Sequence, residues 1–257
     1  MSTIQASIKS SGSEQTTEFS GRIGWLVYAV STYAVGASAL FWFLFAISGL
    51  VPAGFGPIQT NSVIGAIVVN LLLVAQFGAS HSVMARRGFK QWIQQYIPAC
   101  AERATFVLVA GLSMAFLVWN WQSIPGTAWH VTNPVAVPIL WGLNLFGIGY
   151  LLASSFVTNH FELFGLRQAW LNFRRIPYQP LQFKQVWMYR YSRHPMMLGI
   201  LLTVWCMPEM SITRLVIASL MTAYVFIGVF FEERSLVQEF GDTYREYRKR
   251  IGMFFSF

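Results

Sequence analysis

YRYSRHPMMLGILLTVW, residues 189–205, runs two arginines and a histidine directly into a proline and an almost wholly apolar stretch. Proline suits the first turn of a helix, and Ser192 is a plausible N-cap residue. A helix that begins at Pro195 would point its free N–H groups and the positive end of its dipole toward the polar side of the segment. The segment therefore predicts an apolar helix with an anion-binding position at its polar end, although an interfacial anchor would give the same pattern.

The composition of the whole chain places this helix in a membrane. Charged residues make up only 11% of the 257 residues, where soluble domains carry about 25%. Runs apolar enough to span a bilayer core of about 30 Å, roughly 20 residues each, lie at 24–49, 62–80, 103–121 and 136–158. A closer pair follows at 195–208 and 211–231. We therefore expect an all-α fold, a polytopic integral membrane bundle of five to six transmembrane helices.

The last two apolar runs are separated by Pro208 and the residues EMS at 209–211. This break predicts a C-terminal helical hairpin whose first arm is short. Residues 1–21 are rich in Ser, Thr and Gln and have no apolar pattern, so a disordered cytoplasmic tail is predicted there. Residues 22–257 show no internal repeat, and we expect them to form a single membrane-embedded domain.

Positive charge in the loops predicts the orientation of the bundle. One connection is flanked by Arg86, Arg87, Lys90 and Arg103, whereas the loops at 50–61 and 122–135 contain no Lys or Arg. The charged side is therefore expected to be cytoplasmic. By the same rule, the net charge of +8 indicates topology and contact with anionic lipid and not a nucleic-acid partner. The chain's two cysteines fall on opposite sides of the membrane, so neither a disulfide nor a metal site is expected.

Three polar segments are expected to meet on the cytoplasmic side, and any chemistry should be located there. They are 79–88, 158–170, and 189–194 together with 230–250. In the last of these, Glu232 and Glu233 are adjacent, so only one of them can face the bundle. That carboxylate needs a buried donor, which could be Arg193 in a structural salt bridge or a group of a bound ligand.

Downstream, Tyr244, Tyr247 and Arg248 share one face of a predicted cytoplasmic amphipathic helix. A surface helix without a ligand would show the same spacing. Together with the anion-binding position and the paired glutamates, however, these residues offer a carboxylate clamp, partners for ribose hydroxyls and flat walls for a purine. They could therefore bind an adenosyl amino acid.

RHPMMLG (193–199) and EERSLVQEFGDTYREYRKRI (232–251) resemble the signature of the isoprenylcysteine carboxyl methyltransferase and nurim superfamily of membrane proteins. A longer set of motifs resembles the bacterial methanethiol S-methyltransferases within it, namely ASHSVMAR (79–86), CAERATFVL (100–108), WQSIPG (121–126) and NHFELFGLRQAW (159–170). Met197 stands where the carboxyl methyltransferases usually have tyrosine, which disfavours a prenylcysteine substrate. The final IGMFFSF lacks the proline that is common near the end of these families.

The resemblance implies an enzyme that methylates a small thiol, methanethiol to dimethyl sulfide, with S-adenosyl-L-methionine as co-substrate, no metal, and a site open to the cytoplasm at a bacterial inner membrane. Small thiol and lipid bilayer would be its partners, and the oligomeric state is not indicated. It also implies a set of residues that enclose the cofactor: Arg193, His194, the amides around Met196, Met197 and Gly199, Glu232 or Glu233, Tyr244, Tyr247 and Arg248.

Methyl transfer to a thiol needs the thiolate, so a proton acceptor is expected. His81 and His160 end two predicted spans on the cytoplasmic side and are candidates for the catalytic base, whereas His130 lies in an outer loop. Alternatively no base acts, and Arg167 or Arg193 stabilises a thiolate taken from solution. Two other functions stay open, a non-catalytic nurim-like scaffold and a small-molecule uptake protein. Against transport, the first four spans carry only isolated Asn and Gln near their middle.

Overall fold

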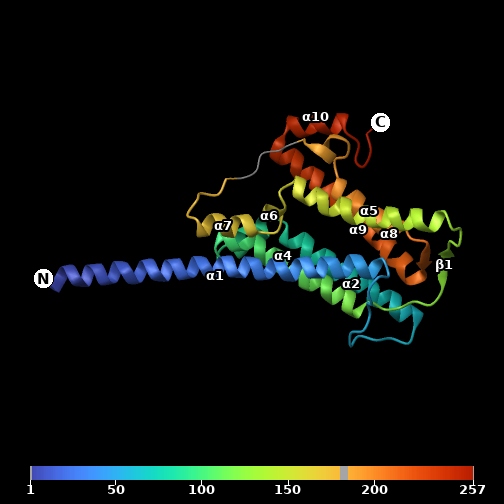
Figure 1. Cartoon of the computed structure of the whole chain (residues 1–257), viewed down its shortest axis with the longest axis horizontal. Helices are drawn as coiled ribbons and strands as arrows, with labels where there is room; N and C mark the ends of the chain where they lie inside the picture. Colours follow the sequence, from blue (N-terminus) through green and yellow to red (C-terminus); the bar gives the residue numbers. More distant parts are fainter. Residues whose placement is uncertain (1, 180–184, 257) are drawn as a thin grey trace.

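The computed structural model describes residues 2–179 and 185–256, with side chains from residue 20 onward. Nearly all of the described secondary structure is helical, and Figure 1 shows the helices as one elongated bundle. The elements are α1 Ser2–Ile47, α2 Val63–Met84, α3 Arg87–Ile93, α4 Ala99–Asn120, β1 Thr127–His130, α5 Ala136–Val157, α6 His160–Leu163, α7 Leu166–Phe173, the 3-10 helix η1 Trp187–Arg190, α8 Pro195–Trp205, β2 Glu209–Ser211, α9 Ile212–Phe240 and α10 Asp242–Arg250.

Within the described residues, five helices are long and apolar enough to cross a membrane, and they confirm the predicted polytopic bundle. They are residues 20–47 of α1, together with α2, α4, α5 and α9. The sixth apolar helix, α8, has 11 residues and is therefore only about 16 Å long, shorter than a bilayer core of about 30 Å. The protein is an integral membrane protein, and its described residues include five helices able to span a bilayer and one short apolar helix.

The predicted C-terminal hairpin is formed by α8 and α9, but the connection between them is more ordered than expected. The residues EMS form β2, which pairs antiparallel with β1 in the register Thr127↔Ser211, Trp129↔Met210 and His130↔Glu209. The Ser211 side chain then accepts a hydrogen bond from the Arg214 amide and caps α9. The hairpin is thereby fixed to the connection between α4 and α5.

The N-terminal segment is helical from Ser2, where an irregular tail was expected over residues 1–21. No proline interrupts the chain before residue 52, and a helix that has already formed adds residues at little cost. In Figure 1 the N-terminal part of α1 extends straight out of the bundle. No break in α1 marks the expected boundary at residue 22.

The centre of the bundle combines an apolar core with buried amides that bridge helices. Buried side chains from α1, α2, α4, α5, α8 and α9 form one contiguous apolar cluster. At its edge Asn144 of α5 accepts a hydrogen bond from Ser48 Oγ at 3.1 Å and donates one to the Thr203 carbonyl at 2.6 Å. Because no water is available in a bilayer core, these bonds satisfy the amide and tie α5 to α1 and α8.

Gly199 allows the backbones of α5 and α8 to touch. A Cβ atom at Gly199 would lie 2.7 Å from both the Gly147 carbonyl oxygen and the Leu151 amide nitrogen. Close backbone approach through small residues is a common way to pack membrane helices. This contact explains the glycine as a packing position against α5, and the cofactor contact expected for the amides around it stays a prediction.

Gly199→Ala is therefore expected to destabilise the protein by roughly 1–3 kcal/mol, because backbone atoms cannot move aside for the new methyl group. Thermal unfolding in detergent measures the effect. Gly149→Ala on α5 is the matched control, since a Cβ there meets nothing within 4 Å, and it should leave stability unchanged or slightly higher. Equal unfolding midpoints for the two variants would contradict the close approach.

Candidate active site at the charged end of the bundle

The three polar segments predicted to meet do lie at the same end of the bundle. This end, which we call the charged end, carries α3, α6, α7 and α10. In Figure 1, α6 and α7 lie on the left of the bundle and α10 lies at the top. Arg86, just after α2, places its guanidinium carbon 4.8 Å from the centre of the Phe231 ring of α9. The 158–170 segment begins directly after α5, and α5 also contacts η1.

Glu233 is the centre of a buried network of charged groups at the start of α8. Its Oε1 lies 2.9 Å from Arg193 Nη2 and 3.2 Å from His194 Nε2, and its Oε2 lies 3.7 Å from Arg248 Nη1. Arg193 Nη1 also donates to the Arg248 carbonyl at 2.9 Å. Glu233 is 39 positions from His194, and Arg248 is 55 positions from Arg193. The fold thus brings distant parts of the chain together at the N-terminus of α8.

The two adjacent glutamates have different surroundings, as expected for neighbours on a helix. The Glu233 side chain is 11% exposed, whereas that of Glu232 is 48% exposed and its Oε2 lies 3.6 Å from His194 Nδ1. Glu233 is therefore the inward carboxylate. The sequence allowed two partners for this carboxylate, Arg193 in a salt bridge or a group of a bound ligand. The structure contains the salt bridge with Arg193.

Tyr244 and Tyr247 of α10 are both buried, with 1% of each residue exposed. The Tyr247 hydroxyl donates to the Tyr189 carbonyl at 2.6 Å, and burial raises its pKa to about 12. Burial and the nearby Glu233 also raise the pKa of Tyr244. Both phenols therefore stay neutral at physiological pH, and their rings, expected as walls for a purine, pack against the protein.

The start of α8 differs in one detail from the predicted cap. Pro195 occupies the first helical turn as expected, but the residue at the N-cap position is His194. Ser192 instead donates its hydroxyl to the Met253 carbonyl at 3.1 Å. The amides of Arg193 and His194 donate to the carbonyls of Gly252 and Met253, at 3.1 Å each. The segment that contains Gly252 and Met253 therefore lies against the N-terminus of α8, and no proline is needed to hold it there.

Among the other cofactor candidates, Met196 packs against the apolar core cluster and Met197 is half-buried in the same turn of α8. Neither side chain makes a polar contact among the described residues. The contact with a cofactor that the resemblance implied for their backbone amides stays a prediction.

The candidate bases His81 and His160 have unlike environments. His160 is buried, its Nδ1 lies 2.8 Å from Ser155 Oγ and its Nε2 lies 3.0 Å from the Tyr33 hydroxyl, and burial lowers its pKa. In His81, Nδ1 lies 3.0 Å from the Tyr224 hydroxyl, and the ring is half-buried. His160 is thus occupied at both nitrogens, whereas the described residues bind His81 at one.

Arg167 is held within the protein. Its Nη1 lies 2.7 Å from Glu162 Oε2, and both terminal nitrogens donate to the Gln179 carbonyl at 3.3 Å. Glu162 also accepts a hydrogen bond from the Tyr178 hydroxyl. The pKa of Tyr178 is raised to about 12, mainly by burial and to a lesser extent by this hydrogen bond. The charge of Arg167 is therefore largely neutralised by Glu162.

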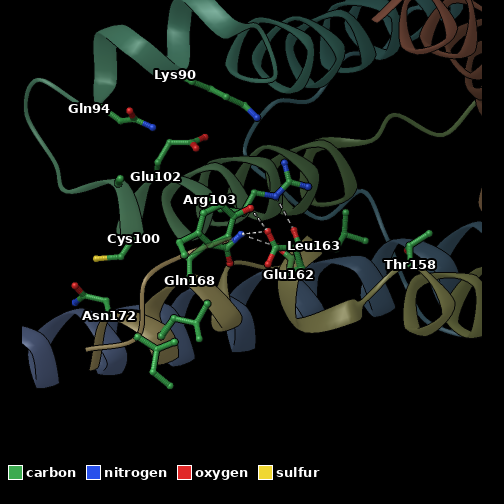
Figure 2. A pocket seen from close by; sticks show the side chains of 14 residues that line it. Lys90, Gln94, Cys100, Glu102, Arg103, Thr158, Glu162, Leu163, Gln168 and Asn172 are labelled. Carbon is green, nitrogen blue, oxygen red and sulfur yellow. Dashed lines mark hydrogen bonds between the residues drawn. The ribbon is translucent and has the colours of Figure 1, made fainter. Parts of the chain in front are cut away.

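A cavity of about 640 Å³, which we call the inner pocket, opens beside Glu162. It is lined from α3, the start of α4, α6, α7 and residues 176–178, and Figure 2 shows its labelled side chains. Two motifs of the resemblance, 100–108 and 159–170, supply six of its fourteen lining residues, but Lys90, Glu102 and Gln168 were not predicted as site residues. Their signal in the sequence was only that they are polar and lie on the charged side. In the described part of the chain, no three His, Cys, Asp or Glu residues gather to hold a metal ion.

Together, five spanning helices and a buried charge network at one end define a polytopic membrane protein with a polar site. The NnrU protein family model matches residues 69–249. A methanethiol S-methyltransferase of Mycobacterium tuberculosis is 43% identical over 188 residues, 73% of this chain and 77% of the relative. Methanethiol S-methyltransferase 2 of Bradyrhizobium diazoefficiens is 38% identical over 233 residues, 90% of each chain. Nurim of Bos taurus is 29% identical over 178 residues, 65% of this chain and 67% of nurim. No solved structure matches the chain.

The chain therefore belongs to the NnrU protein family and, within it, to the family of the methanethiol S-methyltransferases. The protein is a methyltransferase.

Proposed function

We propose that the protein transfers the methyl group of S-adenosyl-L-methionine to a small thiol, and that methanethiol is converted to dimethyl sulfide. The names of its bacterial relatives support the substrate. The positive charge at the charged end supports a site that opens to the cytoplasm of a bacterial inner membrane, because Lys and Arg favour that side.

The observation that carries the proposal is the network around Arg193. Its Nε is buried and has no hydrogen-bond partner among the described residues, so a donor at the mouth of α8 remains available to an acceptor of a ligand. Arg193 and His194 at the start of a helix suit a carboxylate, and the Glu233 carboxylate suits an ammonium or hydroxyl group. These donors and acceptors fit an adenosyl amino acid.

When bound, S-adenosyl-L-methionine supplies a methyl group on a positively charged sulfur. The thiol would first lose its S–H proton, and its sulfur would then form a new bond to the methyl carbon. The bond between that carbon and the sulfonium sulfur would break, with its electron pair left on the sulfonium sulfur. The products would be dimethyl sulfide and S-adenosylhomocysteine. Charge is cancelled along this path, so the apolar helices around the charged end favour it by keeping water away. The thiol, which is small and apolar, can reach such a site from the bilayer.

For the thiol proton we propose His81 as the acceptor, at Nε2. Tyr224 lies against its Nδ1, and if Nδ1 carries the hydrogen and donates to the Tyr224 oxygen, Nε2 has a free lone pair. His160 is a weaker candidate because both of its nitrogens already have partners. Arg167 is paired with Glu162, so it offers little net charge to a thiolate.

An assay on purified protein in nanodiscs tests the proposal. Binding of S-adenosyl-L-methionine is titrated first, and then S-adenosylhomocysteine and headspace sulfides are measured together over a panel of small thiols. Equal amounts of S-adenosylhomocysteine and dimethyl sulfide are expected with methanethiol. Absence of cofactor binding would remove the proposed chemistry and favour a nurim-like scaffold.

A further inference from the structure

The inner pocket is lined by two side chains of opposite charge that are not paired with each other. Lys90 of α3 and Glu102 of α4 both line it, and neither forms an ion pair or side-chain hydrogen bond in the described part of the chain. Figure 2 shows both side chains, and that of Arg103, directed into the cavity. Opposite charges that line one cavity without meeting can be bridged by a molecule that carries both signs.

Arg103 strengthens the positive side of the pocket. Its Nε donates to the Leu163 carbonyl at 2.7 Å, and its guanidinium lies 4.5 Å from the centre of the Phe106 ring. Among the described residues this is its one hydrogen bond. The terminal nitrogens are therefore available beside Lys90 for an anionic group.

Glu162 attracts Arg103 through space, as Glu102 does, but both of its carboxylate oxygens already have hydrogen-bond partners. Arg167 lies 2.7 Å from one of its oxygens, and Gln168 Nε2 donates to the other at 3.0 Å. The acidic group that remains open to a ligand is Glu102.

Gln168 adds an acceptor with a defined direction. Its Nε2 donates to Glu162 Oε1 and to the Glu162 carbonyl at 3.2 Å. Both partners are acceptors only, so the amide cannot be turned the other way. Gln168 Oε1 is consequently a buried acceptor without a hydrogen-bond partner in the described residues, and it requires an N–H or O–H donor.

We propose that the inner pocket binds a small zwitterion, with its anionic group against Lys90 and Arg103 and its primary ammonium against Glu102 and Gln168 Oε1. A volume of about 640 Å³ is in the usual range for small-molecule sites. The same pair of groups occurs in a free amino acid and in the headgroup of an aminophospholipid. The site contains none of the residues that surround Glu233, so the inference does not depend on the proposed methyl transfer.

Cys100 makes the pocket accessible to a direct measurement. It lines the inner pocket and is a free, half-buried thiol, whereas Cys206 is a free, half-buried thiol at the far end of α8. Alkylation by N-ethylmaleimide is followed by mass spectrometry at both cysteines in the same sample. A ligand in the pocket should slow modification of Cys100 several-fold and leave Cys206 unchanged.

Two arms distinguish the sources of the ligand. In detergent, methionine and phosphoethanolamine are added at millimolar concentration, with phosphocholine as control because its quaternary ammonium has no N–H donor. In nanodiscs, phosphatidylethanolamine is compared with phosphatidylcholine. Protection in detergent identifies a soluble ligand, and protection confined to phosphatidylethanolamine nanodiscs identifies a lipid headgroup. Equal alkylation of Cys100 in every arm would overturn the proposal.

Lys90→Gln and Glu102→Gln should each abolish the protection. Arg87→Gln is the matched control, because Arg87 lies on the same helix as Lys90, makes its ion pair with Glu239 at 3.9 Å and does not line the pocket. A rise of the unfolding midpoint with the protecting ligand in wild type and Arg87→Gln, and its loss in the other two variants, provides a second readout. Protection that survives both Lys90→Gln and Glu102→Gln would also overturn the assignment.

Discussion

Glu233→Gln is expected to weaken binding of S-adenosyl-L-methionine by roughly 10- to 150-fold, which corresponds to about 1.5–3 kcal/mol. A neutral amide would replace the carboxylate that Arg193, His194 and Arg248 surround. The positive groups left behind would repel one another and the cofactor's sulfonium in a desolvated place, so stability should also fall by about 3–5 kcal/mol. Cofactor titration and thermal unfolding in nanodiscs measure the two effects separately.

Glu232→Gln is the natural control, because it makes the same change one residue away on a side chain that is 48% exposed. We expect its cofactor affinity to stay within twofold of wild type. If Glu233→Gln loses stability while its cofactor affinity also stays within twofold, the network is a salt bridge with no part in cofactor binding.

His81→Ala is expected to lower the turnover of methanethiol by roughly 100- to 10,000-fold at neutral pH, while cofactor binding is retained. The alkanethiol is mostly protonated at neutral pH, so without a base its reaction depends on the small thiolate fraction in solution. Turnover of the variant should therefore recover partly as the pH rises toward the pKa of the thiol. The pH–rate profile and the cofactor titration are measured on the same preparation.

Two further variants separate the role of His81 from simple packing. Tyr224→Phe removes the hydroxyl that lies 3.0 Å from His81 Nδ1. It should lower turnover less than His81→Ala, because the imidazole of His81 remains and only the hydrogen bond that fixes its tautomer is lost. His160→Ala should lower stability more than turnover, since it removes a ring bound by Ser155 and Tyr33. Equal shifts of the pH–rate profile in the His81 and His160 variants would show that neither histidine takes the proton.

The class of fold could be predicted because membrane insertion acts on local composition. An uninterrupted apolar run near 20 residues has few alternatives to a spanning helix, since every backbone group must be hydrogen-bonded within the segment. Five such runs became α1, α2, α4, α5 and α9. The position of Pro195 and the asymmetry of Lys and Arg were equally local signals, and they located the charged end.

Contacts across the bundle depended on features that single segments do not contain. Which glutamate faces inward followed from the rotation of α9 against α8, and the close contact between Gly199 and α5 followed from the packing of two helices. Ser192 was a reasonable cap on local grounds, but the C-terminal segment provided the Met253 carbonyl for its hydroxyl. The inner pocket required α3, α4, α6 and α7 to be placed together.

The sequence by itself thus determined the spanning helices, their polar ends and the residue types available there, because hydrophobic length, proline and charge act over one turn to one helix. Only the tertiary structure decided that Arg193, His194 and Arg248 meet at Glu233, and that Lys90 and Glu102 line one cavity without pairing. The physical reason is that such contacts depend on helix rotation and close packing between segments, where a shift of one residue turns a side chain by about 100°.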